Sequence, residues 1–142
     1  MNAYFDTSGL LKLLVAEPGS DLAMAIWEST GVAVTSRVTY VEARAALAAA
    51  RRQGRVADAQ LAETRRSLEA RFQAMEVVEV DATIARAAGD IAEQSSLRGY
   101  DAIHLASSLV LDPEETVIVT WDRDLAWAAY AAGLSLAGIS LE

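Results

Sequence analysis

Short apolar runs alternate along the chain with longer stretches whose apolar residues recur every three or four positions. Strands are predicted for the short runs, at 3–5, 32–35, 76–80, 116–120 and 136–139. Helices are predicted between them, at about 8–15, 20–30, 38–53, 56–74, 81–91, 101–111 and 122–132. Strands that alternate with helices are typical of a mostly parallel sheet with helices on both faces, so we expect an α/β fold with about five strands.

The two longest predicted helices lie next to each other in the middle of the chain. Only Gly54 and its neighbours separate 38–53 from 56–74, so this pair is expected to form a protruding helical hairpin. The strand that follows alternates apolar and acidic residues, which favours a place near an edge of the sheet. No repeat or low-complexity linker interrupts the 142 residues, so residues 1–142 are interpreted as a single domain.

Four acidic residues stand just after a predicted strand or early in a predicted helix: Asp6, Glu42, Asp101 and Asp122. Ligands of open α/β sheets usually bind in the crevice outside the carboxyl ends of the strands. Acidic side chains that converge there would bind a cation rather than an anion. Carboxylate oxygens are hard ligands, which suit Mg²⁺ or Mn²⁺.

Three of these acids also have a purely local interpretation. Asp101 and Asp122 each precede a helical stretch and are good N-caps. Glu42 follows Thr39 at the spacing of a capping box, but a helix that begins earlier, at Ser36, would point Glu42 inward instead. The spacing alone leaves both interpretations of Glu42 open.

Further polar residues flank the acids and are candidate auxiliaries. Thr7, Ser8 and Thr120 place hydroxyls beside them, although hydroxyls at strand ends are more often part of turns. Asp124 is either a fifth acid of the site or, as we favour, a first-turn residue that interacts with the helix dipole. His104, the only histidine, follows Asp101 by one turn; its apolar neighbours favour a packed histidine over a proton-transfer partner.

Composition narrows the chemistry. Cysteine is absent, which excludes disulfides, thiolate metal sites and cysteine nucleophiles, and argues against zinc. No Gly-x-Ser-x-Gly elbow and no closely spaced glycines after the first strand are present, which argues against a serine hydrolase and a nucleotide-binding fold. No apolar stretch approaches the roughly 20 residues that cross a bilayer, so we expect a cytoplasmic protein without a membrane partner.

Charge is distributed unevenly along an acidic chain. The formal net charge is −8, but the window 37–71 holds eight arginines against four acids and is therefore net +4, which leaves −12 elsewhere. Arg44, Arg51 and Arg55 share one helical face by spacing and are candidates for binding phosphates. The alternative is a solvated helix surface, and the pattern favours neither.

Four segments together resemble the motifs of the PIN-domain ribonucleases, and more narrowly the VapC-type toxins of toxin-antitoxin pairs. They are residues 4–12 (YFDTSGLLK), 41–47 (VEARAAL), 100–106 (YDAIHLA) and 119–126 (VTWDRDLA), in the family's order and at similar spacing. The resemblance covers nearly the whole chain. It implies a three-layer α/β/α fold whose acids, here Asp6, Glu42, Asp101 and Asp122, hold Mg²⁺ or Mn²⁺.

The resemblance also implies an activity and partners. Such an enzyme would hydrolyse RNA phosphodiester bonds through metal-activated water, with Asp101 or Glu42 as proton acceptor, and leave 5′-phosphate and 3′-hydroxyl ends. Arg44, Arg51 and Arg55 would then bind RNA. A homodimer and inhibition by a cognate antitoxin protein are expected. The alternative is a catalytically inactive PIN-fold module that binds RNA or protein.

Overall fold

The computed structural model describes every residue from 1 to 142 and is built around one sheet of five parallel strands. The strands are β1 (Asn2–Phe5), β2 (Val32–Ser36), β3 (Glu76–Val78), β4 (Thr116–Thr120) and β5 (Ser135–Gly138). Their order across the sheet is β3-β2-β1-β4-β5. The expected α/β fold with a parallel sheet of about five strands is therefore confirmed, and β3 lies at an edge as its alternating pattern predicted.

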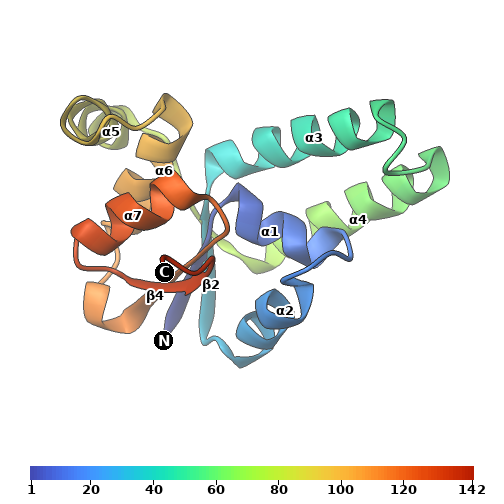
Figure 1. Cartoon of the computed structure of the whole chain (residues 1–142), viewed down its shortest axis with the longest axis horizontal. Coiled ribbons are helices and arrows are strands. Elements are labelled where there is room, and N and C mark those ends of the chain that lie inside the picture. Colours follow the sequence, from blue (N-terminus) through green and yellow to red (C-terminus); the bar gives the residue numbers. More distant parts are fainter.

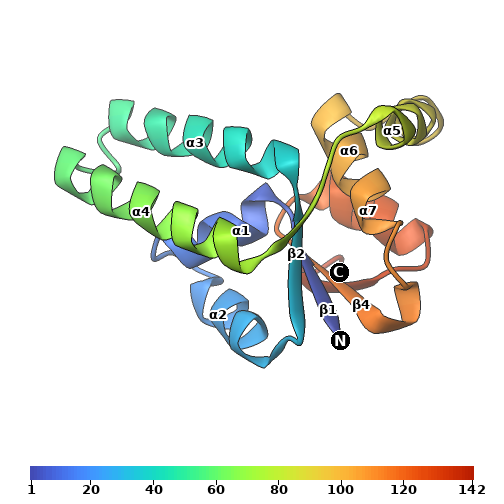
Figure 2. The same cartoon turned by 180° about the vertical axis from the view of Figure 1, so that it is seen from behind.

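Seven helices cover the two faces of this sheet. They are α1 (Thr7–Leu14), α2 (Ser20–Ser29), α3 (Arg37–Arg52), α4 (Asp58–Ala74), α5 (Ala82–Ser95), α6 (Gly99–Ser108) and α7 (Arg123–Ala131). Helices α1 to α4 lie on one side of the sheet and α5 to α7 on the other, which gives the expected three layers (Figures 1 and 2). No helix combines the length and the apolar composition that a membrane span requires.

Alternation along the central strands sends neighbouring side chains into two separate cores. In β1, Tyr4 packs among residues of α5, α6 and α7, whereas Phe5 packs among residues of α1, α2 and α4. In β4, Ile118 and Val119 divide in the same way. Because successive strand residues point to opposite faces, buried runs of apolar residues are what a sheet covered on both sides requires.

The strand order places a topological switch point between β1 and β4. The chain moves from β1 outward through β2 to β3, and then returns to the other side of β1 with β4. Loops that leave two neighbouring strands in opposite directions open a crevice at their carboxyl ends. Asp6 directly follows β1, and a single residue separates Asp122 from the end of β4, so both acids stand at this crevice.

Helices α3 and α4 form the expected hairpin, which projects away from the rest of the molecule (Figure 1). Helix α3 begins after Ser36, whose hydroxyl accepts a hydrogen bond from the Val38 amide at 3.2 Å. Thr39 does not cap a helix, because its hydroxyl accepts a hydrogen bond from Thr35 at 2.8 Å inside the fold. Of the two interpretations left open for Glu42, the earlier helix start is correct and the capping box is wrong.

The end of α3 corrects one prediction about the arginines. The helix stops at Arg52, and Gly54, with a φ of 73°, turns the chain toward α4. Arg55 therefore lies in the connection between the two helices and does not share a helical face with Arg44 and Arg51. Sequence spacing missed this because it assumed that helical geometry continued through the turn.

Candidate active site

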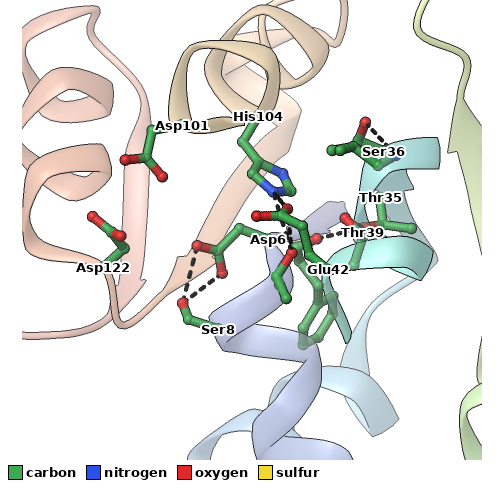
Figure 3. Close-up of polar contacts among 12 residues, drawn as sticks. Asp6, Ser8, Thr35, Ser36, Thr39, Glu42, Asp101, His104 and Asp122 are labelled. Carbon is green, nitrogen blue, oxygen red and sulfur yellow. Dashed lines mark hydrogen bonds and ion pairs between the residues drawn. The ribbon is translucent and has the colours of Figure 1, made fainter. Parts of the chain in front are cut away.

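All four predicted acids line one cavity of about 290 Å³ at the crevice between β1 and β4. They come from four different parts of the chain: the end of β1, the second turn of α3, the first turn of α6 and the start of α7. The complete lining is Asp6, Thr7, Ser8, Leu11, Glu42, Arg98, Tyr100, Asp101, His104 and Asp122. The fold thus brings residues separated by more than a hundred positions into one site (Figure 3).

Asp6 is the central acid, and its carboxylate also caps a helix. Its Oδ1 accepts a hydrogen bond from the Gly9 amide at 2.8 Å, which satisfies the amino end of α1. Ser8 donates to both carboxylate oxygens, at 2.7 and 2.9 Å, and Thr120 donates to Oδ2 at 2.6 Å. Asp6 is only 3% exposed, so these hydrogen bonds fix the orientation of its side chain.

Glu42 is held by a chain of hydrogen bonds that begins inside the sheet. His104 Nε2 lies 2.7 Å from Glu42 Oε1, and Thr7 donates to the same oxygen at 2.7 Å. Because an ionised carboxylate can only accept, Nε2 donates to Glu42, and the Tyr4 hydroxyl lies 2.9 Å from Nδ1 on the other side of the ring. Tyr4 and His104 are both buried, so the position of Glu42 depends on the core.

Asp101 and Asp122 face each other across the opposite wall of the cavity (Figure 3). The guanidinium of Arg98 bridges them: Nη2 lies 3.2 Å from Asp101 Oδ2 and 3.3 Å from Asp122 Oδ2. Asp122 also caps α7 by accepting from the Leu125 amide at 3.0 Å. Asp101 is the third residue of α6 and caps nothing, so the N-cap interpretation is wrong for Asp101 and correct for Asp122.

The surroundings shift the pKa values of these acids in different directions. Burial raises the pKa of Asp6 above its ordinary value, and His104 and the hydrogen bonds to the carboxylate offset only part of this rise. Burial and then the charge of Asp122 raise the pKa of Asp101, against the influence of Arg98. Burial acts in the same sense on Glu42, but the hydrogen bonds from His104 and Thr7 and the electrostatic influence of His104 and Arg98 together outweigh it, so the pKa of Glu42 is lowered.

The donor set fits a hard divalent cation by its chemistry. The cavity offers carboxylate and hydroxyl oxygens and no sulfur, and one oxygen each of Asp101 and Glu42 makes no hydrogen bond. The side chains lie too far apart to form a closed metal site: no three His, Asp or Glu side chains converge closely enough to hold one ion. Cation binding therefore requires side-chain movement, most directly at Asp101 and Asp122.

The predicted auxiliaries separate into two groups. Thr7 and Ser8 line the cavity, and Thr120, although outside the lining, holds Asp6. Asp124 is exposed in the first turn of α7 and does not line the cavity, which agrees with the dipole interpretation.

Two residues of the site were missed by sequence reasoning. His104 is packed, as predicted, but it also contacts Glu42, and its spacing along the helix gave no signal of this distant partner. Arg98 reaches two acids from the loop before α6, and nothing in the sequence pattern distinguished it from other exposed arginines.

Comparison with known families identifies the family to which this chain belongs. The family model described as the PIN domain matches residues 3–131, which is most of the chain and includes all four acids. This chain belongs to the PIN-domain family. The resemblance carried by the four sequence segments is thereby confirmed.

Relatives of this PIN domain have been described as ribonucleases. The chain is 43% identical over 139 residues to ribonucleases VapC45 and VapC49 of Mycobacterium tuberculosis, strains CDC 1551 and H37Rv respectively. Each alignment covers 98% of this chain and 96% of the relative. Among solved structures, VapBC-5 of M. tuberculosis, a member of the VapBC family of toxin-antitoxin systems, aligns with a TM-score of 0.61 at 23% identity over 97% of this chain and 98% of that one. This last likeness concerns the fold alone.

Proposed function

We propose that this chain is a divalent-metal-dependent endoribonuclease that acts as the toxin of a toxin-antitoxin pair, with residues 1–142 as a single PIN domain. The main support is the 43% identity to two named VapC ribonucleases over 98% of the chain. The cavity adds chemical support, because it gathers four carboxylates from distant segments, contains no cysteine, and holds a serine, Ser8, that is bonded to Asp6 and not to His104.

Asp6, Glu42, Asp101 and Asp122 are the residues that we assign to the cation, which is Mg²⁺ or Mn²⁺. When bound, such a cation neutralises charge on the phosphoryl oxygens and makes a water molecule more acidic. Asp6 provides a fixed carboxylate, because Ser8 and Thr120 hold both of its oxygens. Asp101 and Glu42 each keep one oxygen free of hydrogen bonds, which a proton acceptor for the attacking water requires.

His104 and Tyr4 act in this proposal as positioning residues. Both are buried, and the hydrogen bonds from Tyr4 through His104 hold Glu42 Oε1 toward the cavity. Leu11 and Tyr100 complete the lining beside the acids. The arrangement orients one acid from inside the fold.

The partners follow from the same relatives. These relatives are named VapC, and VapBC-5 is a member of a family of toxin-antitoxin systems, so we propose a cognate antitoxin that inhibits this chain. A homodimer as the active form is proposed from the family resemblance alone. RNA is the proposed substrate.

The activity is tested by incubating the purified protein with a panel of single-stranded RNAs. We expect cleavage with Mn²⁺, none with EDTA, and recovery when Mn²⁺ is restored in excess. The products should carry 5′-phosphate and 3′-hydroxyl ends, which ligation and end-labelling distinguish from cyclic phosphates. Cleavage that persists in EDTA would contradict the proposal.

The alternative is a PIN-fold module that binds RNA or protein without turnover. Two observations favour it: no three of the acidic and histidine side chains are close enough to hold an ion, and Arg98 already pairs with two of the acids. Such a module would bind the same RNAs equally well with Mn²⁺ and with EDTA and would release no products in either condition.

The hairpin arginines are proposed to bind RNA phosphates beside the cavity. In the free protein they have weak local partners: Arg44 donates to the Tyr40 hydroxyl at 2.8 Å, Arg51 lies 3.6 Å from Asp58, and Arg55 donates to Gln53 at 3.0 Å. One of these contacts is an exposed ion pair and two are single hydrogen bonds to neutral groups, which contribute little net stability and can be exchanged for phosphate.

Replacing Arg44, Arg51 and Arg55 together with glutamine is expected to weaken RNA binding and to flatten its dependence on salt. Each lost phosphate contact reduces the slope of log K against log salt by about 0.7, so the triple variant should lose about 2. Binding is measured in EDTA, which prevents turnover. Arg86→Gln, an exposed arginine on α5 with no ion pair, should leave the slope unchanged; an equal slope in the triple variant would return these residues to the solvated surface.

A further inference from the structure

Arg98 is the one arginine that lines the cavity, and no lysine does. It precedes α6 and reaches back across the opening, with its guanidinium within hydrogen-bonding distance of Asp101 Oδ2 and Asp122 Oδ2. The two carboxylate side chains are only 10% and 24% exposed, whereas the Arg98 side chain is 75% exposed. An exposed positive group therefore contacts two largely buried negative groups.

We propose that Arg98 is an internal counter-ion, which holds Asp101 and Asp122 together in the cation-free protein and which a divalent cation must displace. This inference rests on the proposed function, because it concerns the same cation site.

Asp101 and Asp122 need a positive partner in the cation-free protein. Two carboxylates that face each other repel, and burial strengthens this repulsion because less water screens it. Arg98 is the only charged partner that reaches both of them. Without it, the wall formed by Asp101 and Asp122 would carry two uncompensated charges, and the pocket would be less stable.

Arg98 and a divalent cation would compete for the same two carboxylates. The bonds of Arg98 end on one oxygen of each carboxylate, Oδ2 of Asp101 and Oδ2 of Asp122. A cation held between Asp101 and Asp122 would occupy the place of the guanidinium, and like charges exclude each other at this distance. The two states are therefore alternatives: either Arg98 bridges the acids or a cation does.

A divalent cation would displace Arg98 at a modest cost in free energy. Arg98 has a long side chain, most of which is in solvent, and its bridge is made from the rim rather than from the core. Ion pairs with an exposed partner typically contribute less than about 1 kcal/mol each, so a divalent cation can break them. The cost nevertheless falls on cation binding, so Arg98 raises the cation concentration at which the site fills.

Isothermal titration of Mn²⁺ onto wild type, Arg98→Gln, Arg98→Lys and Arg86→Gln tests this directly. Arg98→Gln is expected to bind Mn²⁺ about three- to tenfold more tightly than wild type, which corresponds to the loss of two weak ion pairs. Arg98→Lys keeps the charge but loses the planar fork, so it should fall between the two. Arg86→Gln makes the same change of net charge far from the cavity and should bind like wild type.

Thermal unfolding in EDTA gives a second readout that needs no cation. Arg98→Gln should melt below wild type and below Arg86→Gln, because only Arg98→Gln leaves Asp101 and Asp122 without their counter-ion. Addition of Mn²⁺ should then stabilise Arg98→Gln by more than it stabilises wild type.

The outcomes separate this inference from the function on which it rests. Equal or weaker Mn²⁺ binding by Arg98→Gln, while wild type binds normally, would overturn the counter-ion role and leave the cation site intact. Tightening of the same size in Arg86→Gln would also overturn it, since the cause would then be net charge. Absence of Mn²⁺ binding in every variant, wild type included, would overturn the cation site and this inference together.

Discussion

Replacing Asp6 with asparagine is expected to reduce the rate of RNA cleavage about a thousandfold while leaving the protein folded. The carboxylate is the fixed acid at the centre of the cavity, and an amide cannot supply its negative charge to a cation. Asparagine is nearly as good an N-cap as aspartate, so α1 should persist. The measurement is the initial rate of cleavage with Mn²⁺, together with a thermal melt followed by circular dichroism.

The chain offers a matched control for this variant. Asp81 caps α5 as Asp6 caps α1: its Oδ1 accepts from the Ile84 amide at 2.9 Å, and it lies outside the cavity. Asp81→Asn therefore makes the same chemical change at a helix start and should cleave RNA at the wild-type rate. A comparable loss in both variants would assign the effect to capping, and a near wild-type rate for Asp6→Asn would remove Asp6 from the catalytic residues.

Replacing Gly9 with alanine is expected to lower the free energy of unfolding by about 2 kcal/mol or more, although alanine is the better helix former. A Cβ at Gly9 would lie 2.3 Å from the backbone oxygen of Val119, far inside ordinary contact. Backbone cannot give way as a flexible side chain can, so α1 would have to move away from β4. Because this movement separates Asp6 from Thr120, cleavage should fall as well.

Gly89 provides the opposite case within the same molecule. It lies inside α5, and a Cβ there would meet no atom within 4 Å. Gly89→Ala should raise the free energy of unfolding by up to about 1 kcal/mol, because alanine restricts the unfolded chain and favours the helix. Urea unfolding measures the free energy of unfolding of both variants. A Gly9→Ala protein as stable as Gly89→Ala would mean that α1 is not packed against β4 as closely as described.

The sheet and its acids could be predicted because local sequence is sufficient to define them. Buried parallel strands are short apolar runs, as in β4, and a carboxylate directly after such a run must lie at the carboxyl edge of the sheet. Asp6 and Asp122 were located in this way. Sequence pattern also placed β3 at an edge, because acidic residues stand among the apolar ones of the predicted strand 76–80.

Other features depended on contacts that local sequence does not contain. Ser36 and Thr39 are both acceptable helix caps, and the choice between them was made by Thr35, which uses the hydroxyl of Thr39 within the core. The contact of His104 with Glu42 depends on Tyr4, which is a hundred residues away from His104 in the chain. Spacing along one helix cannot reveal such a partner.

The dual role of Asp6 affects how activity can be inferred in other members of the family. Because Asp6 also caps the amino end of α1, a descendant that has lost its chemistry would still be under selection to retain a capping residue, aspartate among them, at this position. Asp101 caps no helix, and its only hydrogen bonds are to Arg98. Retention of the counterpart of Asp101 is therefore the more informative marker for telling working nucleases from silent relatives.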